Sequence, residues 1–303
     1  MKGALLIGGA GFIGRNLQDE LERRGYRILV ADLSVAANSH RQVRLAVSQT
    51  EELTHLLKDA SLDVVIHLAS GLLPASEGSA FAREQDLIVR PSLELMATCA
   101  RLGKRFVLFS SGGTVYGEGG ATPIAEDRPV DPTSCYARSK VLLEQAVREA
   151  HARDGLEYLI LRPSNPYGRY QRIDGPQGLI AVAIGKGLGG QTLKIRGDGN
   201  AVRDYIDVRD LASAAVDLAA GAAVNRTLNV SSGVGQSVEA VIATVERVLG
   251  RQIARACTPP RSSDLQSVIL DPRALAALVP WAPRPLDRGV QEFYDDIRSG
   301  QHA

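Results

Sequence analysis

The sequence of 303 residues is poor in net charge, in cysteine and in aromatic side chains. Its 35 basic and 34 acidic residues leave a net charge of +1, so it lacks the positive surface with which proteins bind nucleic acids or anionic membranes. The three cysteines, Cys99, Cys135 and Cys257, form no C-x-x-C pair, which argues against a disulfide framework and against a zinc site. The five histidines show no metal-ligand spacing either, so we predict no bound metal.

Long hydrophobic runs are also missing. No apolar run approaches the roughly 18 residues of a transmembrane helix, and the first apolar segment leads directly into glycines with no cleavage-type site behind it. We therefore expect a cytoplasmic protein that does not enter a membrane. Hydrophobic residues make up 45% of the chain and charged residues 23%, which excludes a disordered chain and allows one large or two ordinary domains.

Short apolar runs alternate with amphipathic segments through the first half, a pattern typical of βαβ units around a parallel sheet. We expect strands at 2–7, 27–32, 62–68, 105–110, 157–161 and 227–230, and helices at 12–24, 81–101, 136–153 and 207–220. This pattern predicts an α/β fold with a Rossmann-type doubly wound parallel sheet over 1–165, rejoined by about 203–232. The segments 166–202 and 233–303 are expected to form a smaller C-terminal substrate-binding cap.

A glycine-rich loop follows the first predicted strand. Glycines here permit a tight turn and let the backbone and the helix N-terminus approach a pyrophosphate. The loop residues expected to line a cofactor are Gly8, Gly11, Phe12, Ile13 and Gly14. Asp32 ends the second strand, where a carboxylate can accept both ribose hydroxyls of NAD and would repel the extra phosphate of NADP. We therefore expect NAD as the cofactor, although Asp32 could instead simply close the strand end.

Tyr136 and Lys140 stand four residues apart in a predicted helix and so share one helical face. Leu143 and Val147 continue this face, which indicates that it packs inward and holds both polar groups near the sheet. A free phenol has a pKa of about 10, and an adjacent ammonium and an oxidised nicotinamide would lower that pKa. Tyr136 would then remove a hydroxyl proton during hydride transfer, while Lys140 holds the cofactor ribose. The alternative interpretation is an ordinary exposed pair on a helix.

Several further motifs complete a pattern that resembles a known family. They are DVVIHLA at 63–69, SSGGTVYG at 110–117, LRPSNPYG at 161–168, GDG at 197–199 leading to RDY at 203–205, and Arg261 followed by Asp264. With the glycine loop and the Tyr-Lys pair, they resemble the extended short-chain dehydrogenases/reductases. Within these, the chain is most similar to the NAD-dependent nucleotide-sugar epimerase/dehydratase group, in particular the UDP-galactose and UDP-N-acetylhexosamine 4-epimerases. The resemblance covers nearly the whole chain.

This resemblance implies roles for individual residues. Strand-end residues that would line NAD are Leu68, Ala69, Ser110 and Pro163. Residues that would hold the nucleoside diphosphate of a nucleotide-sugar substrate are Asn165, Arg203, Arg261 and Asp264, with Gly112 and Gly113 beside the sugar. Guanidiniums suit a pyrophosphate and a carboxylate suits a ribose diol. The resemblance also implies a homodimer that pairs helices 81–101 and 136–153, although core packing would explain their apolar stripes equally well.

The chain departs from the family pattern in the loop after the fourth long strand. The family places a Ser or Thr hydroxyl where this chain has Gly112, and that hydroxyl shares a hydrogen bond with the reacting sugar oxygen. Thr114 or Ser111 would have to replace it, and we favour Thr114 by a small margin. Dehydratases carry an Asp-Glu pair where this chain has Gly113 and Thr114, so the acid and base of a dehydration are missing.

Two further departures concern the cofactor and the sugar. Ala46 stands where the family commonly has an Asp that contacts adenine, so we expect backbone and apolar contacts there. Val268 stands where a large side chain restricts the carbon-2 substituent of the sugar, so we expect 2-acetamido sugars to be accepted. The function expected is 4-epimerisation of a nucleotide sugar through a 4-keto intermediate. The alternatives are an NAD(P)-dependent nucleotide-4-keto-sugar reductase and a non-catalytic dinucleotide sensor.

Overall fold

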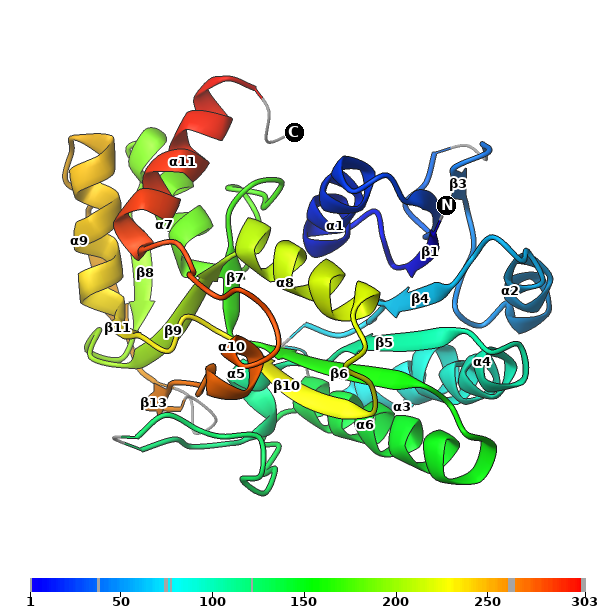
Figure 1. The fold of residues 1–303 in the computed structure, drawn as a ribbon. Coiled ribbons are helices and arrows are strands. Elements are labelled where there is room, and N and C mark those ends of the chain that lie inside the picture. The colour runs from blue at the N-terminus through cyan, green and yellow to red at the C-terminus, as the bar shows by residue number, and fades with distance from the viewer. Residues whose placement is uncertain are drawn as a thin grey trace.

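A parallel sheet forms the centre of the molecule (Figure 1). The computed structural model describes residues 2–36, 39–73, 76, 78–120, 122–260 and 265–300. The sheet has seven strands in the order β10-β6-β5-β4-β1-β2-β3, all parallel. These strands are β1 (Gly3–Ile7), β2 (Arg27–Ala31), β3 (Gln42–Val43), β4 (Val64–His67), β5 (Arg105–Phe109), β6 (Tyr158–Pro163) and β10 (Arg226–Val230). The order reverses beside β1, which creates a switch point for ligand binding.

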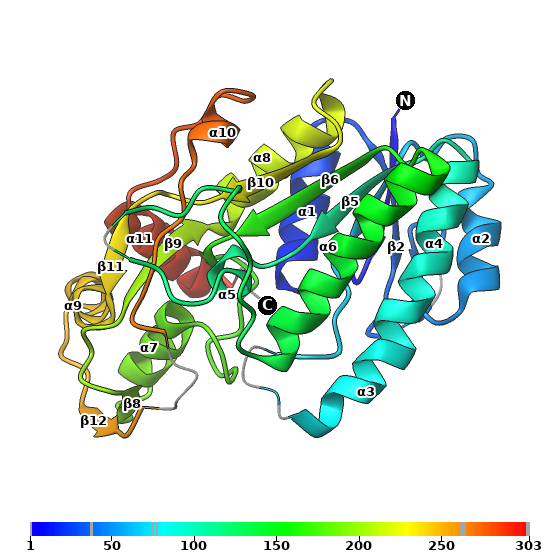
Figure 2. The same cartoon turned by 90° about the horizontal axis from the view of Figure 1, so that it is seen from below.

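Helices cover both faces of this sheet (Figures 1 and 2). On one face α1 (Phe12–Arg23) packs beside α8 (Val208–Ala220), and leucines of both helices enter a core with β1, β4 and β6. On the other face lie α2 (Thr50–Leu57), α4 (Arg90–Arg101) and α6 (Cys135–Asp154). The strands between these layers are buried on both faces, which explains their nearly continuous apolar sequence. The doubly wound α/β fold expected from the sequence is therefore confirmed.

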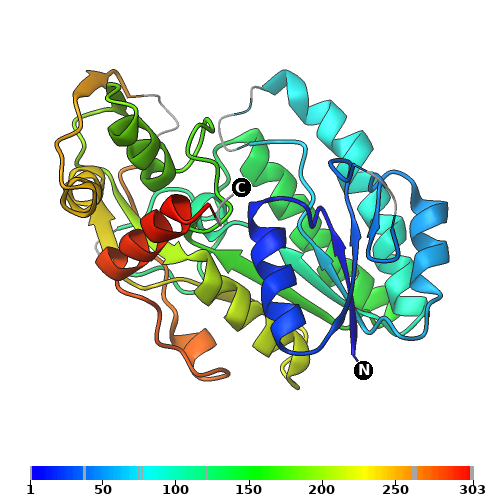
Figure 3. The same cartoon turned by 90° about the horizontal axis from the view of Figure 1, so that it is seen from above.

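The remaining elements form a smaller layer beside the carboxyl ends of the strands (Figure 3). Its strands are β7 (Asn165–Tyr167), β9 (Val202–Asp207), β11 (Gly235–Ser237) and β13 (Ser267–Val268) in one sheet, and β8 (Leu193–Arg196) with β12 (Arg255–Thr258) in another. Its main helices are α7 (Leu179–Leu188), α9 (Val238–Leu249) and α11 (Leu286–Arg298), which share one apolar core. We call this layer the cap. Strand β9 pairs with cap strands, so the chain returns to the central domain with α8 rather than at residue 203.

The predicted helix at 81–101 differs in detail from the structure. It consists of α3 (Phe81–Glu84), a π-helical turn (Gln85–Val89) and α4, preceded by a 3₁₀ turn at Gly78–Ala80. A π turn inside an α-helix is rare and often accompanies a functional site. Two short helices, α5 (Gly112–Val115) and α10 (Arg273–Ala276), complete the described elements. Among these helices, none is both long and apolar enough to cross a membrane.

Candidate active site

The glycine loop between β1 and α1 opens into a cavity at the switch point. A Cβ added to Gly8 would lie 2.7 Å from the amide nitrogen of Ala69, and one on Gly14 would lie 2.3 Å from the carbonyl oxygen of Gly9. The same Cβ on Gly11 would meet nothing nearer than 3.8 Å. Packing therefore requires glycine at 8 and 14, whereas Gly11 leaves open space at the N-terminus of α1. That helix carries no acidic residue in its first turn and no side-chain cap, so its free N–H groups suit a pyrophosphate.

Asp32 lies in the adenosine end of this cavity. Its carboxylate accepts hydrogen bonds from the backbone N–H of Ala10 at 2.9 Å and of Ser34 at 2.7 Å, which fixes its orientation beside the glycine loop. The cavity measures about 690 Å³, and Ala46 and Ala69 are in its wall. A carboxylate held in this way can accept the hydroxyls of a ribose, as the sequence position of Asp32 predicts.

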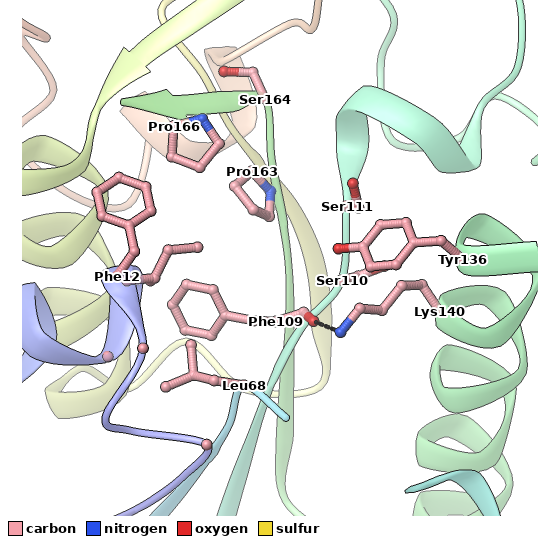
Figure 4. Close-up of a pocket in the computed structure, with 14 residues that line it drawn as sticks. Phe12, Leu68, Phe109, Ser110, Ser111, Tyr136, Lys140, Pro163, Ser164 and Pro166 are labelled. Atoms are coloured by element: carbon pink, nitrogen blue, oxygen red, sulfur yellow. Dashed lines mark hydrogen bonds between the residues drawn. The ribbon is translucent and has the colours of Figure 1, made fainter. Parts of the chain in front are cut away.

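The second end of the cofactor cavity contains the pair on α6 (Figure 4). The predicted cofactor residues that line this end are Gly8, Gly11, Phe12, Ile13, Gly14, Leu68, Ser110, Tyr136, Lys140 and Pro163. The loop after β1, the ends of β4, β5 and β6 and the start of α6 supply them. Helix α6 begins at Cys135 because the side chain of Ser134 accepts the backbone N–H of Ala137 and caps it. The structure thus brings together residues that lie up to 155 positions apart in the chain.

Lys140 is fully enclosed at the base of this cavity. Its ammonium donates to the carbonyl oxygen of Phe109 at 3.0 Å and lies 5.7 Å from the centre of the Tyr136 ring. Burial lowers the pKa of Lys140 to about 8, while the charges of Glu84 and Glu144 act in the opposite direction. Because this pKa is still above neutral pH, most of the amine is protonated there and can serve as a cation.

Tyr136 is partly buried, and desolvation raises the pKa of its phenol. The Ser111 side chain acts to lower that pKa, and the charge of Glu84 acts to raise it. The Lys140 ammonium is directed at the Phe109 carbonyl rather than at the phenol oxygen (Figure 4).

The loop after β5 explains the missing hydroxyl at Gly112. A Cβ at this position would lie 2.4 Å from Leu270 Cδ1 and 2.8 Å from the carbonyl oxygen of Arg162, so packing excludes any side chain. The side chain of Ser111 lies beside the Tyr136 phenol (Figure 4), whereas the hydroxyl of Thr114 donates weakly to the Ser111 carbonyl oxygen at 3.4 Å. Both residues line the same cavity as Tyr136.

A second cavity extends from Tyr136 towards the cap. It measures about 570 Å³, and it is lined by Ser111, Gly113, Thr114, Tyr136, Lys140, Asn165, Gln171, Gln177, Leu179 and Tyr205, among others. Asn165 donates to the carbonyl oxygen of Asp204 at 2.8 Å, which ties β7 to β9. The side-chain oxygens Ser164 Oγ and Gln171 Oε1, from residues in this lining, are buried and have no hydrogen-bond partner among the described residues. Polar atoms of this kind indicate a polar ligand.

Of the other predicted substrate residues, Arg261 and Asp264 lie outside the described residues. Arg203 is not in the lining of this cavity, and its guanidinium donates to the backbone carbonyls of Val202 at 2.8 Å and Leu265 at 2.6 Å. Val268 is 1% exposed, packs with apolar side chains near Leu270 and is likewise absent from this lining.

Sequence reasoning missed four residues of the site. Ser164, Gln171 and Tyr205 line the second cavity, and Glu84 lies in the wall of the first. Ser164 and Tyr205 belong to the LRPSNPYG and RDY motifs quoted above, which was the available signal. No signal in the sequence indicated Glu84, because it is one of several charged residues in a predicted amphipathic helix.

Comparisons with known proteins agree with this geometry. Residues 4–231 match the sequence model of the NAD dependent epimerase/dehydratase family. A putative UDP-glucose 4-epimerase of Methanocaldococcus jannaschii is 30% identical over 306 residues, covering 99% of both chains. A dTDP-4-dehydro-6-deoxyglucose reductase of Escherichia coli is 30% identical over 309 residues, covering 98% of both chains. The crystal structure of the UDP-glucose 4-epimerase of Thermotoga maritima with UDP-glucose is 28% identical and superposes with a TM-score of 0.91, covering 98% of this chain and 99% of that one.

The chain therefore belongs to the NAD-dependent epimerase/dehydratase family, and its cofactor is NAD. The open space at Gly11, the uncapped N-terminus of α1 and the oriented carboxylate of Asp32 fit that dinucleotide.

Proposed function

We propose that this protein is a nucleotide-sugar 4-epimerase, with a UDP-hexose or UDP-N-acetylhexosamine as substrate. The observation that carries the proposal is the shared position of Tyr136 and Lys140, which line both the cofactor cavity and the cavity beneath the cap. A sugar hydroxyl in the second cavity then meets the phenol beside the cofactor. Epimerases of UDP-glucose among the relatives support the same substrate class.

Bound NAD supplies a hydride acceptor that returns the hydride to carbon 4. Tyr136 takes the proton of the 4-hydroxyl as the carbonyl forms and gives it back when the carbonyl is reduced. Lys140 holds a positive charge beside the phenol and the cofactor ribose. Because the 4-keto sugar must turn over between the two transfers, the nucleotide must be anchored separately. Asn165 and Tyr205 of the cap line the cavity and can do this, with Arg203, Arg261 and Asp264 as the further anchors that the family resemblance implies.

Ser111 replaces the hydroxyl that Gly112 cannot carry. Its side chain lies beside the Tyr136 phenol, so it can share the proton of the sugar oxygen with that phenol. Thr114 lines the same cavity, but its hydroxyl is directed at the Ser111 carbonyl oxygen, so we assign it to the sugar ring rather than to the reacting oxygen.

The test is to incubate the purified protein, with and without added NAD, with UDP-hexoses and UDP-N-acetylhexosamines, and to resolve the 4-epimers by NMR. We expect interconversion without net change of the cofactor, and Tyr136→Phe should slow it about 10³-fold because proton transfer is lost. Stoichiometric oxidation of a reduced cofactor with a 4-keto sugar would instead identify a reductase. Full turnover by Tyr136→Phe would contradict the mechanism.

The protein is also proposed to be a cytoplasmic homodimer. Leu93 on α4 is an apolar side chain that is 45% exposed, as a helix-to-helix dimer contact would require. The three cysteines are free, which suits a reducing compartment.

A further inference from the structure

Glu84 is a buried carboxylate that the mechanism above does not use. It ends α3, immediately before the π turn, and is only 2% exposed. Its oxygens accept hydrogen bonds from the backbone N–H of Gly71 at 2.8 Å and from the hydroxyls of Ser70 at 3.1 Å and Ser139 at 3.5 Å. Ser70 and Gly71 follow β4 and line the wall of the cofactor cavity. Ser139 directly precedes Lys140 on α6. Glu84 thus joins the wall of the cofactor cavity to the catalytic helix.

The close approach at Gly71 shows that this contact is built into the loop. A Cβ on Gly71 would lie 2.8 Å from Glu84 Oε2, so only glycine allows the backbone to reach the carboxylate. Ser70 in turn bonds the carbonyl oxygen and the N–H of Leu72. Since Ser70 and Leu72 line both cavities, the carboxylate of Glu84 fixes a loop that touches cofactor and substrate alike.

A second buried glutamate, Glu144 on α6, provides the contrast. Arg162 neutralises it through two hydrogen bonds of 2.8 and 2.6 Å. All the hydrogen-bond donors to Glu84 among the described residues are neutral. Burying a carboxylate without a cation is costly, so its charge acts on whatever titratable groups surround it.

The titratable groups around Lys140 come from three elements. Glu84 of α3 and Glu144 of α6 both raise the pKa of Lys140 against the effect of burial. His67 of β4 faces Lys140 as well, but burial and that ammonium lower its pKa to about 3, so it is neutral. Around Tyr136, Glu84 raises the pKa and Ser111 of the β5 loop lowers it. Glu84 is therefore the only one of these groups that acts in the same direction on both members of the catalytic pair.

We propose that Glu84 is a positioning residue of the active site: it holds the Ser70–Gly71 loop against α6 and places a negative charge near the Tyr136–Lys140 pair. This inference rests on the proposed roles of Tyr136 and Lys140. Removing the charge, as in Glu84→Gln, should lower the pKa of both groups, since the nearby negative charge favours the protonated form of each. Lys140 would then lose its proton at a lower pH, and the alkaline limit of activity would move down.

The primary test needs no substrate. The Tyr136 phenol is titrated by ultraviolet difference absorbance, as wild type minus Tyr136→Phe and as Glu84→Gln minus the double variant. We expect the midpoint to move to lower pH in Glu84→Gln. Asp86→Asn is the matched control, because Asp86 lies on the next turn, is exposed and pairs with Arg90; its midpoint should equal that of wild type. An unchanged midpoint in folded Glu84→Gln would overturn the proposal.

Two further measurements keep the inference testable. If Glu84→Gln does not fold, ¹³C NMR of glutamate-labelled wild-type protein, with the resonance assigned through Glu84→Asp, must show an ionised Glu84 at neutral pH; a protonated carboxyl would overturn the proposal. With a substrate identified by the epimer panel, the alkaline limit of kcat/KM should shift down in Glu84→Gln, whereas a purely structural role would lower the rate without moving that limit. Because the phenol titration is independent of turnover, its failure is distinct from failure of the proposed activity.

Discussion

The two sides of Tyr136 are organised differently. On the cofactor side the polar groups are already held: two backbone N–H groups fix Asp32, and Lys140 donates to the Phe109 carbonyl. On the substrate side Gln171 Oε1 is buried with no hydrogen-bond partner among the described residues. The cofactor side is therefore preorganised by the protein, while the substrate side is completed by its ligand. Substitutions on the two sides should accordingly affect different measurements.

After Tyr136→Phe, the largest effect is expected at the junction of the two sides, in Ser111→Ala. Loss of the hydroxyl beside the Tyr136 phenol should lower kcat about 10²-fold, the size typical of one lost proton-transfer partner. NAD affinity should stay within a few-fold of wild type. Epimerisation assayed by NMR and NAD binding measured by calorimetry check the two statements.

Thr114→Val is the matched control for Ser111. It removes a hydroxyl from the same loop and the same cavity, but one that bonds only a backbone carbonyl. We expect kcat to change by no more than a few-fold. The reverse ranking would restore the order favoured by sequence alone and would mean that the loop moves when substrate binds.

The cofactor side was also the side that sequence could predict. Its residues belong to short contiguous signals, such as a glycine loop after a strand, Asp32 at the end of the next strand and Y-x-x-x-K in a helix, and each signal encodes its own local geometry. Every residue predicted to bind the cofactor lines one of the two cavities that meet at the glycine loop. Six of the seven strands of the sheet could be predicted because they are apolar runs buried on both faces, whereas β3 is two residues long and only partly buried.

The next prediction separates the glycines of the cofactor loop. Gly11 has extended backbone angles, φ −76° and ψ 177°, and open space where a Cβ would lie. Gly11→Ala should therefore fold with unchanged thermal stability but bind NAD about tenfold more weakly, a loss of about 1.4 kcal/mol, because the methyl group occupies the pyrophosphate space. Calorimetric titration and a thermal unfolding curve measure the two quantities.

Gly14→Ala should behave in the opposite way. Its Cβ would lie 2.3 Å from the Gly9 carbonyl oxygen, so the substitution should lower the unfolding temperature. Equal stability of the two variants would contradict the division between a structural and a cofactor-facing glycine.

The substrate side was harder to predict because its residues depend on tertiary packing. Val268 turned out to be buried among apolar side chains, since β13 pairs with β9 and directs it inward. Gly112 is glycine because Leu270 and Arg162 approach it from elements far along the chain. Glu84 bonds a loop 13 residues earlier and a helix 55 residues later. No local pattern encodes such contacts.

The smallest effect is expected in the cap, at Arg203. Its guanidinium bonds the backbone at Val202 and Leu265 and lies outside the lining of the cofactor cavity. Arg203→Gln should raise KM for the nucleotide sugar about fivefold, or about 1 kcal/mol, because the segment that leads to Arg261 and Asp264 loses its anchor. NAD affinity and kcat should remain unchanged. Lys194→Gln is the control, since it removes an exposed cation of β8 and should leave KM unaltered. A kcat loss without a KM change would place Arg203 at the reacting end of the sugar, which would remove the separation between the anchored nucleotide and the turning sugar.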